Sequence, residues 1–267
     1  MRGPIDLRGK WVLVVGASSG LGHSMSHVVA RDYGGNLVLA ARRRTRLVDL
    51  ANTLRAQYGV EAVPCQTDLQ NPADVERLVF ESTSGRSLRG VLLNAGVTYY
   101  GRHCNISNEL SDAIITTNLS SIVALTECFV KYFSQQPQGG GLLLVSSLAS
   151  FLPLPYQALY GASKAFVTSF AHALREEIRE TNVSITVFAP GGIATEMLEY
   201  SGLDKRFNRH GIWVMPAQRC AKLAVRAFVR RKSLAIPGVL NKLTYAVIRV
   251  TPRALVTRMA AMLYRVQ

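Results

Sequence analysis

The chain has 267 residues, of which 48% are hydrophobic and 18% are charged. This is the composition of a soluble globular protein that is long enough to bury a substantial core, in one large domain or two small ones. No apolar run approaches the roughly 20 residues of a membrane-spanning helix, and the first ten residues lack the apolar core of a signal peptide, so a cytoplasmic protein is expected.

The formal net charge of +14 is concentrated near the end of the chain. Residues 218–267 contain eleven Lys or Arg and no Asp or Glu, which leaves 20 basic and 17 acidic residues in the first 217. A surface that binds nucleic acid would spread its basic charge further, so no nucleic-acid partner is expected. The four cysteines form no CxxC pair and the five histidines are dispersed, so we predict no metal site.

The first apolar segment leads directly into a glycine-rich turn. Residues 11–15 (WVLVV) have the β-branched run of a buried strand, and an apolar-periodic helix reaches about residue 33. Between them lies the sequence from Gly16 to Gly22, whose glycines permit a tight turn and a close approach to a pyrophosphate. The N-terminus of the following helix supplies free N–H groups and the positive end of a dipole. Strand, turn and helix in this order predict a dinucleotide-binding turn.

The second strand, residues 36–41, is followed at once by Arg42 and Arg43. In dinucleotide-binding folds an acidic residue near this position accepts from the ribose 2′-OH, whereas an arginine suits a 2′-phosphate. Ala41 stands where the acid would be, so the sequence favours NADP(H) over NAD(H). The alternative is a solvated basic cluster at the start of a helix.

Strands and helices then alternate to the end of the chain. Further strands are predicted at residues 61–66, 91–93, 142–145, 182–189 and 233–236. Helices are predicted at residues 45–58, 72–84, 108–133, 160–180 and 216–231. Near-continuous apolar strands that alternate with helices predict an α/β fold, in which a parallel sheet is covered on both faces. We predict one domain over residues 1–238, including a lid at 191–215, and a basic amphipathic extension over 239–267.

The most informative stretch is the sequence from Ser146 to Lys164, which begins where an apolar strand ends. Tyr160 and Lys164 are four residues apart at the start of a helix, so their side chains share one face, about 5–6 Å apart at Cβ. A phenol with a pKa of about 10 is a poor acid near neutrality, and a nearby cation is expected to lower that pKa. Ser147 could offer its hydroxyl to the same substrate oxygen. An exposed surface pair is the alternative interpretation of Tyr160 and Lys164.

These residues resemble the classical short-chain dehydrogenase/reductase family over residues 10 to 237. The resemblance depends on seven motifs in family order: Gly16-x-x-x-Gly20-x-Gly22, Asp68, Asn94-Ala95-Gly96, Asn118, Ser147, Tyr160-x-x-x-Lys164 and Pro190-Gly191-x-x-x-Thr195. It implies a single Rossmann-type, doubly wound parallel sheet of about seven strands with helices on both faces, and a nicotinamide cofactor.

The resemblance also implies a role for each site residue. Tyr160 would donate or accept the proton, Ser147 would orient the substrate carbonyl, and Asn118 would belong to a water relay that reaches Lys164. Lys164 would also bind the nicotinamide ribose, and Thr195 the carboxamide. The residues expected to contact NADP(H) are Gly16, Ser18, Ser19, Gly20, Leu21, Gly22, Arg42, Arg43, Asp68, Leu69, Asn94, Ala95, Gly96, Tyr160, Lys164, Pro190, Gly191, Ile193 and Thr195.

Two residues depart from the family pattern. Val15 replaces the usual hydroxyl residue before Gly16, which removes a side chain that often braces the loop at Asn94. Leu93 replaces the frequent first Asn of that loop. Both changes are expected to affect loop rigidity or cofactor affinity and not the catalytic residues.

Apolar side chains gather on the predicted substrate side. They are Phe151, Leu152, Leu154, Tyr156, Met197, Leu198, Tyr200, Phe207 and Trp213. An apolar pocket with few polar groups suits a hydrophobic ketone with an acyl chain, a steroid-like ring or an aryl group. About half of these side chains could instead be ordinary packing.

The C-terminal extension is apolar, and Pro252 divides it into two helical pieces. Its basic residues are Lys242, Arg249, Arg253, Arg258 and Arg265. One interpretation is a peripheral contact with anionic lipid headgroups, which would make the protein membrane-associated. The other is a helix pair that covers the substrate mouth or contacts another subunit.

The sequence thus favours an NADP-dependent oxidoreductase that interconverts a hydrophobic ketone and a secondary alcohol, with Tyr160 as general acid/base. The alternatives are an NAD-dependent alcohol dehydrogenase working oxidatively and a non-catalytic NADP-binding regulatory protein. The family often forms homodimers or homotetramers through the helices that carry Asn118 and Tyr160, so a homo-oligomer is expected.

Overall fold

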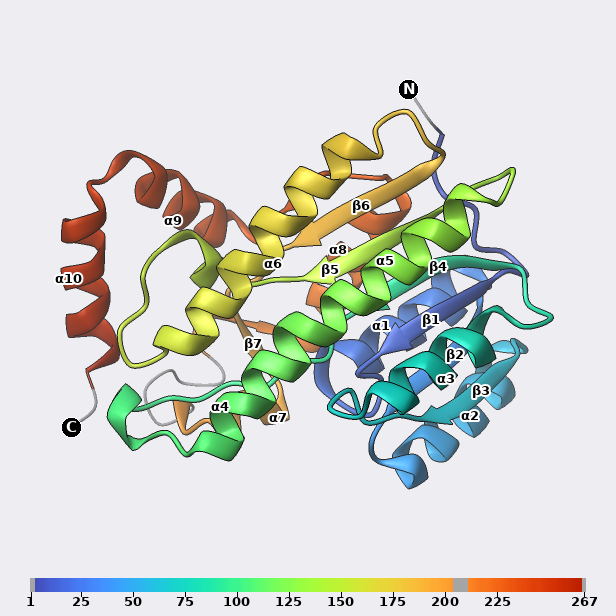
Figure 1. Cartoon of the computed structure of the whole chain (residues 1–267), viewed down its shortest axis with the longest axis horizontal. Coiled ribbons are helices and arrows are strands. Elements are labelled where there is room, and N and C mark those ends of the chain that lie inside the picture. The colour runs from blue at the N-terminus through green and yellow to red at the C-terminus, as the bar shows by residue number, and fades with distance from the viewer. Residues whose placement is uncertain (1–2, 204–210, 266–267) are drawn as a thin grey trace.

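The computed structural model describes residues 3–203 and 211–265 and shows a seven-stranded sheet (Figure 1). The strand order is β3-β2-β1-β4-β5-β6-β9, and every neighbouring pair is parallel. The strands are β1 (Trp11–Val15), β2 (Asn36–Ala41), β3 (Ala62–Gln66), β4 (Leu88–Leu93), β5 (Gly140–Val145), β6 (Val183–Phe188) and β9 (Leu234–Ala235). The predicted fold class is therefore confirmed, with all seven strands within a few residues of their predicted bounds.

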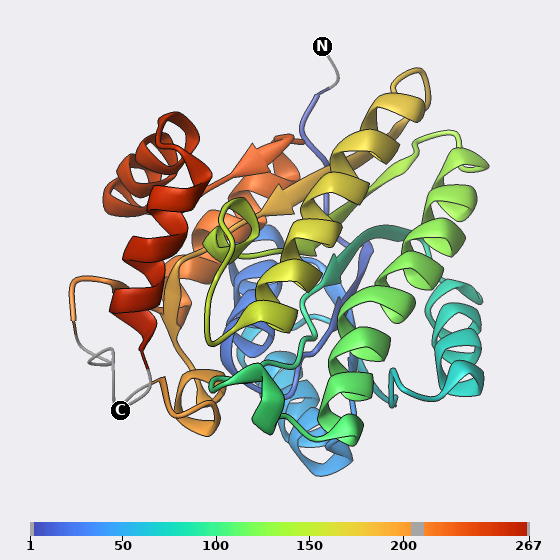
Figure 2. The same cartoon turned by 60° about the vertical axis from the view of Figure 1, so that its left-hand side comes forward.

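Helices cover both faces of this sheet and enclose one hydrophobic core on each side (Figures 1 and 2). One face carries α1 (Gly20–Tyr33), α2 (Arg44–Tyr58) and α8 (Ala217–Val229). The other carries α3 (Pro72–Thr83), α5 (Ser121–Ser134) and α6 (Ala158–Glu177). Because both faces are buried, the strands need apolar residues at successive positions, which explains their continuous apolar runs.

The helix predicted over residues 108–133 is not a single regular α-helix. It consists of α4 (Asn108–Ile115), a π-helical segment η2 (Thr116–Ser120) and α5. A π-helical turn inserts one extra residue and redirects the side chains next to it, and such turns are frequent at functional sites. The segment η2 contains Asn118, whose side chain is fully buried.

The same helical run, Asn108–Ser134, is long and apolar enough to cross a membrane, as judged by length and composition within the described residues. This corrects the expectation that no apolar stretch approaches that length. Leu125, Phe129 and Phe133 of this run are buried in the core beside the sheet. The core helix of a soluble protein passes the same test, so length and composition alone do not distinguish the two cases.

The segment expected to be an irregular lid contains regular structure. A short helix α7 (Glu196–Tyr200) follows β7 (Gly192–Ala194), and β7 pairs in parallel with β8 (Val214–Pro216) in a separate two-stranded sheet. Phe207, predicted to line the substrate pocket, lies outside the described residues.

The C-terminal extension forms two helices, α9 (Val239–Val250) and α10 (Arg253–Tyr264), separated at Pro252 as expected. They lie at the opposite side of the molecule from β3 and α2, next to the loop between β5 and α6 (Figures 1 and 2). That loop contains a 3₁₀ turn, η3 (Leu148–Phe151), whose Phe151 ring packs edge-on against Tyr245 of α9 at 4.5 Å between centroids.

β1 lies between β2 and β4 in the sheet. The chain first adds β2 and β3 on one side of β1 and then β4, β5 and β6 on the other, so the strand order reverses between β1 and β4. In open α/β sheets, ligands bind in the crevice outside the carboxyl ends of the strands at such a switch point. A continuous cavity of about 1760 Å³ opens there.

Candidate active site

The glycine turn after β1 forms one wall of the cavity. Gly16 has φ +85° and Gly20 has φ +56°, both in the left-handed region that favours glycine. A Cβ atom on Gly22 would lie 2.1 Å from the carbonyl oxygen of Gly16, so only glycine fits there. Ser19 caps α1 in an extended conformation, and the first turn of α1 carries no acidic residue. The turn and helix start thus offer backbone N–H groups with no acidic side chain and no side-chain cap at the helix start, which fits a pyrophosphate.

The basic residues after β2 reach across to this turn. The Arg43 guanidinium donates from Nη2 to Ser19 Oγ at 2.8 Å, and to Ser18 Oγ at 3.2 Å. Its Nη1 donates to Glu196 Oε2 at 3.0 Å. Arg42 is exposed and also lines the cavity. Arg43 is therefore not part of a merely solvated basic cluster, because its guanidinium is hydrogen-bonded both to the glycine turn and to Glu196 across the crevice.

The loop after β4 forms the opposite wall. Asn94 Nδ2 donates to the carbonyl oxygen of Gly16 at 3.2 Å, and the backbone N–H groups of Asn94 and Ala95 both donate to Val15 O, at 3.1 and 3.0 Å. A valine at position 15 has no hydroxyl to brace this loop, but its backbone carbonyl does so. Leu93, the second departure from the family pattern, is buried in the core.

Asn118 sits behind this loop and clamps it. Its Oδ1 accepts from Val97 N at 2.8 Å, and its Nδ2 donates to Val97 O at 2.9 Å and to Ser163 Oγ at 3.0 Å. All the polar atoms of the amide are thus used to position Gly96 and its neighbours. The structure assigns this clamp to the Asn118 side chain, while the water relay implied by the family resemblance stays a prediction.

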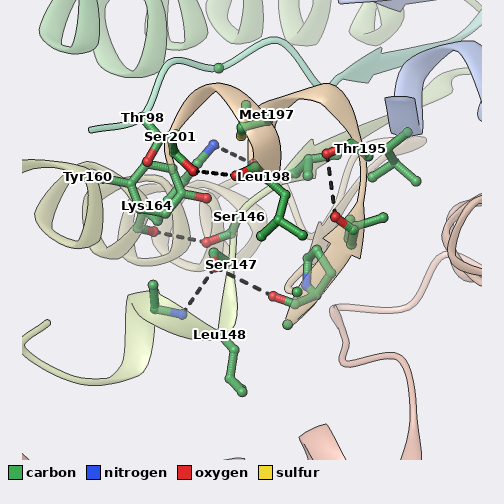
Figure 3. Close-up of a pocket in the computed structure, with 18 of the residues that line it drawn as sticks. Thr98, Ser146, Ser147, Leu148, Tyr160, Lys164, Thr195, Met197, Leu198 and Ser201 are labelled. Atoms are coloured by element: carbon green, nitrogen blue, oxygen red, sulfur yellow. Dashed lines mark hydrogen bonds between the residues drawn. The ribbon is translucent and has the colours of Figure 1, made fainter. Parts of the chain in front are cut away.

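Ser147, Tyr160 and Lys164 meet at the carboxyl end of β5 (Figure 3). Ser147 lies beside the Tyr160 phenol and acts to lower its pKa, and its Oγ accepts from Ala149 N at 3.2 Å. Lys164 Nζ lies 5.8 Å from the centroid of the Tyr160 ring and donates to Val145 O at 3.0 Å. Tyr160 and Lys164 therefore do not form the exposed surface pair that was the alternative interpretation, since both line the cavity and Lys164 is only 5% exposed.

The pKa of Tyr160 differs from the sequence expectation. Burial raises the pKa of the Tyr160 phenol, and Ser147 opposes this in part. Burial also lowers the pKa of Lys164 to about 8. The expectation that Lys164 would lower the phenol pKa was wrong for this conformation, because burial is the largest influence on the Tyr160 pKa and Lys164 is not among the groups that shift it. The lowered pKa of Lys164 lies close to the physiological pH range.

Several residues that the motifs do not include hold this group in place. Ser146 Oγ donates to Lys164 O at 3.0 Å and is 2.7 Å from Thr168 Oγ1, which fixes α6 to the end of β5. Gln157 Nε2 donates to Thr98 Oγ1 at 3.0 Å and so ties the start of α6 to the loop after β4. Tyr156 has φ +65°, a strained conformation four residues before the phenol. The sequence places Ser146 next to Ser147, but it gives no local signal for the roles of Gln157 and Thr98.

Of the predicted site residues, all line the cavity except Gly22 and Asn118, which support its walls from behind. On the substrate side Leu152, Leu154, Met197, Leu198, Tyr200 and Trp213 line it. Figure 3 shows Met197 and Leu198 together with Tyr160 and Ser147 among the residues that line this cavity. The inclusion of Phe151 and Tyr156 was wrong, because neither lines the cavity.

The C-terminal helices α9 and α10 form part of the apolar wall of this cavity. From the sequence, a cover over the substrate mouth was one of several interpretations of this extension. The lining residues from α9 and α10 include Leu243, Val247, Val256, Met259, Ala260 and Tyr264. Tyr264 packs in one cluster with Tyr160, Leu152 and Leu154. Burial, with the neighbouring phenols of Tyr160 and Tyr100, raises the pKa of Tyr264 to about 12. The apolar walls are thus built from three separate parts of the chain.

The fold and this site together define a Rossmann-type oxidoreductase: a dinucleotide crevice at the switch point, beside an apolar cavity whose wall carries Tyr160, Ser147 and the buried Lys164. The family model for short chain dehydrogenases matches residues 10–206. The chain belongs to the short-chain dehydrogenase/reductase family, whose members are oxidoreductases that act on CH–OH groups with a nicotinamide cofactor.

Its curated relatives include several hydroxysteroid dehydrogenases. The chain is 32% identical over 254 residues to 11-beta-hydroxysteroid dehydrogenase 1A of Arabidopsis thaliana, covering 90% of this chain and 71% of that protein. It is 30% identical to 17-beta-hydroxysteroid dehydrogenase type 3 of Mus musculus, covering 72% of this chain and 63% of the mouse protein.

Solved structures share the fold over nearly the whole chain. A short-chain dehydrogenase from Sphingobium yanoikuyae in complex with NADPH superposes with a TM-score of 0.80 at 26% identity, covering 97% of this chain and 96% of that one. A family member from Burkholderia phymatum in complex with NAD superposes with a TM-score of 0.83 at 22% identity, covering 91% and 93%. Both nicotinamide cofactors thus occur among the structural neighbours.

Proposed function

We propose that this protein is an NADPH-dependent reductase of hydrophobic ketones, with steroid-like ketones as the favoured class. The observation that carries the proposal is the position of Tyr160, with Ser147 and Lys164, where the nucleotide crevice meets a cavity with apolar walls. The names of the relatives, which act on hydroxysteroids, agree with a large apolar substrate. Acyl and aryl ketones are the other substrates that such walls admit.

The preference for NADP(H) is supported by the charge at the end of β2. The end of β2 has no acidic residue that could accept from a ribose 2′-OH. Arg42 and Arg43 stand there instead and line the cavity. A 2′-phosphate forms strong bidentate hydrogen bonds with guanidinium groups. The glycine turn would hold the pyrophosphate, while Asp68 and Leu69 line the cavity where the adenine would lie.

The mechanism follows from what the side chains can do at the carbonyl. When bound, NADPH supplies a hydride for the carbonyl carbon. The Tyr160 hydroxyl gives its proton to the carbonyl oxygen, and the Ser147 hydroxyl donates a hydrogen bond to the same oxygen. Both groups act where negative charge develops, so they stabilise the transition state more than the ground state. The Lys164 ammonium stabilises the phenolate that remains on Tyr160.

A panel of ketones tests this function. The purified protein is incubated with NADPH or NADH and with 3-, 7-, 11- and 17-ketosteroids, aryl ketones and 3-ketoacyl esters, and the loss of absorbance of the reduced cofactor is followed. We expect the highest kcat/KM with a ketosteroid and NADPH. Equal rates with both cofactors would contradict the NADP preference, and faster oxidation of the alcohols with NAD would support an oxidative alcohol dehydrogenase instead. No turnover with any compound would favour a non-catalytic regulatory protein.

The pH dependence provides a separate prediction. Burial lowers the pKa of Lys164 to about 8, so below that value the ammonium is present and above it the charge is lost. We expect kcat/KM for ketone reduction at saturating NADPH to be level below about pH 8 and to fall roughly tenfold per unit above it, since this parameter reports the enzyme before the ketone binds. The profile is measured at constant ionic strength, with circular dichroism to confirm folding. A level profile to pH 10 would rule out a Lys164 that titrates near 8.

We also propose that α9 and α10 make a peripheral contact with anionic lipid while their other sides line the cavity. Three exposed apolar side chains on the two helices lie outside the cavity lining, namely Val239, Val250 and Leu255, and basic residues lie among them. Leu243, Val247, Met259, Met262 and Leu263 are also more than half exposed, although they belong to the cavity lining. Apolar side chains interspersed with basic ones suit the surface of an acidic membrane.

Sedimentation with vesicles tests the lipid contact. The full-length protein is expected to sediment with phosphatidylserine vesicles and not with neutral ones. A variant with Lys242→Glu and Arg249→Glu is expected to lose this binding. Equal sedimentation of both proteins would contradict the proposal, and a helix pair that only covers the cavity would be the better description.

The proposed homo-oligomer would form through helices that carry exposed apolar residues. Ile115 on α4 and Phe166 on α6 are each 42% exposed, and Phe166 stacks on Phe170 of the same helix. A dimeric or tetrameric mass in light scattering would support this arrangement, and a monomeric mass would exclude it.

A further inference from the structure

We propose that Glu196 is a built-in competitor for the 2′-phosphate of the cofactor, so that binding of this phosphate releases the first turn of α7. The proposal deepens the proposed function and rests on its NADP preference. The carboxylate of Glu196 bridges two arginines: Oε2 accepts from Arg43 Nη1 at 3.0 Å, and Oε1 accepts from Arg46 Nη1 at 2.5 Å. These residues are about 150 positions apart in sequence and close the crevice from opposite sides.

The Glu196 carboxylate holds the same guanidinium that faces the glycine turn. Arg43 donates to Ser18 and Ser19 with its Nη2 and to Glu196 with its Nη1. The hydrogen bonds from Arg46 and Arg43 lower the pKa of Glu196, so it is a carboxylate at neutral pH. An anion bound by Arg43 beside the turn therefore meets a negative charge already in place.

The balance of interactions favours the phosphate over the carboxylate. The side chains of Arg43, Arg46 and Glu196 are 39%, 45% and 32% exposed, and ion pairs this open to water are individually weak. A phosphate monoester carries more charge than a carboxylate at neutral pH and has three acceptor oxygens for the guanidinium groups. A 2′-phosphate would therefore displace Glu196 from the two arginines. With a ribose that has only hydroxyls, Glu196 would remain paired with them.

Release of Glu196 would act on the substrate cavity because of where this residue stands. Glu196 is the first residue of α7, and Met197, Leu198 and Tyr200 of this helix line the cavity. Its neighbour Thr195 packs closely on the glycine turn: a Cβ added to Gly20 would lie 2.9 Å from Thr195 Cγ2. Through these residues, the arrival of a phosphate at Arg43 changes the position of a wall that contacts the substrate.

The binding of nucleotide fragments tests this competition without catalysis. Glu196→Gln removes the charge and keeps the shape, and Glu199→Gln removes an equal charge from the same helix as a matched control. Titration calorimetry with adenosine 2′,5′-bisphosphate should show binding about 2- to 5-fold tighter for Glu196→Gln than for the unaltered protein, the upper part of the range expected when a weak exposed ion pair is lost. Binding of 5′-AMP should change less than about twofold, and Glu199→Gln should resemble the unaltered protein for both ligands.

The outcomes separate this proposal from the one on which it rests. If the unaltered protein prefers the bisphosphate over 5′-AMP but Glu196→Gln binds it no more tightly, the competition is refuted and the NADP preference stands. If the unaltered protein does not distinguish the two ligands, both proposals fail. Equal tightening in Glu199→Gln would show a general charge effect and would also refute a specific role for Glu196.

Fluorescence quenching tests the release of α7. Trp213 lines the cavity next to β8, whereas Trp11 is the first residue of β1, at the end of this strand that points away from the cavity. Adenosine 2′,5′-bisphosphate should increase acrylamide quenching of tryptophan in the unaltered protein. Glu196→Gln should show the increased quenching without ligand. Identical quenching in all samples would refute the coupling to α7.

Discussion

Replacement of Tyr160 by Phe is expected to lower kcat for ketone reduction at least about 100-fold, the lower end of acid–base effects. Phenylalanine keeps the ring, and therefore the packing of Tyr160 with Leu152, Leu154 and Tyr264. It removes the one hydroxyl that meets Ser147 and can release a proton to the carbonyl oxygen. The Kd of NADPH, measured by quenching of protein fluorescence, should change less than about threefold, because the glycine turn and the arginines are untouched.

Tyr156→Phe is the matched control for this substitution. It removes the same hydroxyl from a tyrosine four residues away that does not line the cavity. Its kcat should stay within about twofold of the unaltered value, since substitutions away from functional groups have small effects. Near-normal turnover in Tyr160→Phe, with the same fold by circular dichroism, would remove the proton-donor assignment.

The second large effect is expected at the glycine turn. A Cβ on Gly22 would lie 2.1 Å from Gly16 O and 2.7 Å from Asn94 Nδ2, so Gly22→Ala must move the turn or the loop after β4. Overpacking of this kind costs about 1–3 kcal/mol. If that cost falls on the cofactor-binding conformation, the Kd of NADPH rises about 10- to 100-fold, since 1.4 kcal/mol is a factor of ten. Fluorescence titration with NADPH measures this change.

Gly3→Ala serves as the control, because no atom lies within 4 Å of a Cβ added there. This substitution should leave both the Kd of NADPH and the melting temperature unchanged. If Gly22→Ala bound NADPH as tightly as the unaltered protein, the crevice beside Gly16 would not be the nucleotide site.

The alternation of elements could be predicted because a parallel sheet covered on both faces leaves a simple pattern. Residues at successive positions of β5 and β6 are buried, so these strands appear as continuous apolar runs. The site residues could be predicted because they follow the ends of strands or stand at fixed helical spacing. The Val15 carbonyl oxygen braces the loop after β4 by accepting two hydrogen bonds. This could not be predicted, because a backbone carbonyl accepts hydrogen bonds whatever the residue type.

Other features depend on three-dimensional packing that no local pattern records. The π-helical segment around Asn118 interrupts an otherwise regular helical periodicity. Phe151 was assigned to the substrate pocket from its position in the chain, but it packs on Tyr245, about 95 residues later. The direction of the pKa shift at Tyr160 depends on how deeply the phenol is buried, and spacing to Lys164 does not reveal this. The bridge from Glu196 to Arg43 and Arg46 joins opposite walls of the crevice.

The most direct test of this account follows one hydrogen atom. NADPH carrying deuterium at the transferable position of the nicotinamide is incubated with the protein and the ketone of highest kcat/KM, and the alcohol is analysed by mass spectrometry. The account predicts one deuterium on the carbinol carbon and a hydroxyl proton that exchanges with solvent. An unlabelled alcohol, or no alcohol from any ketone tested, would contradict it.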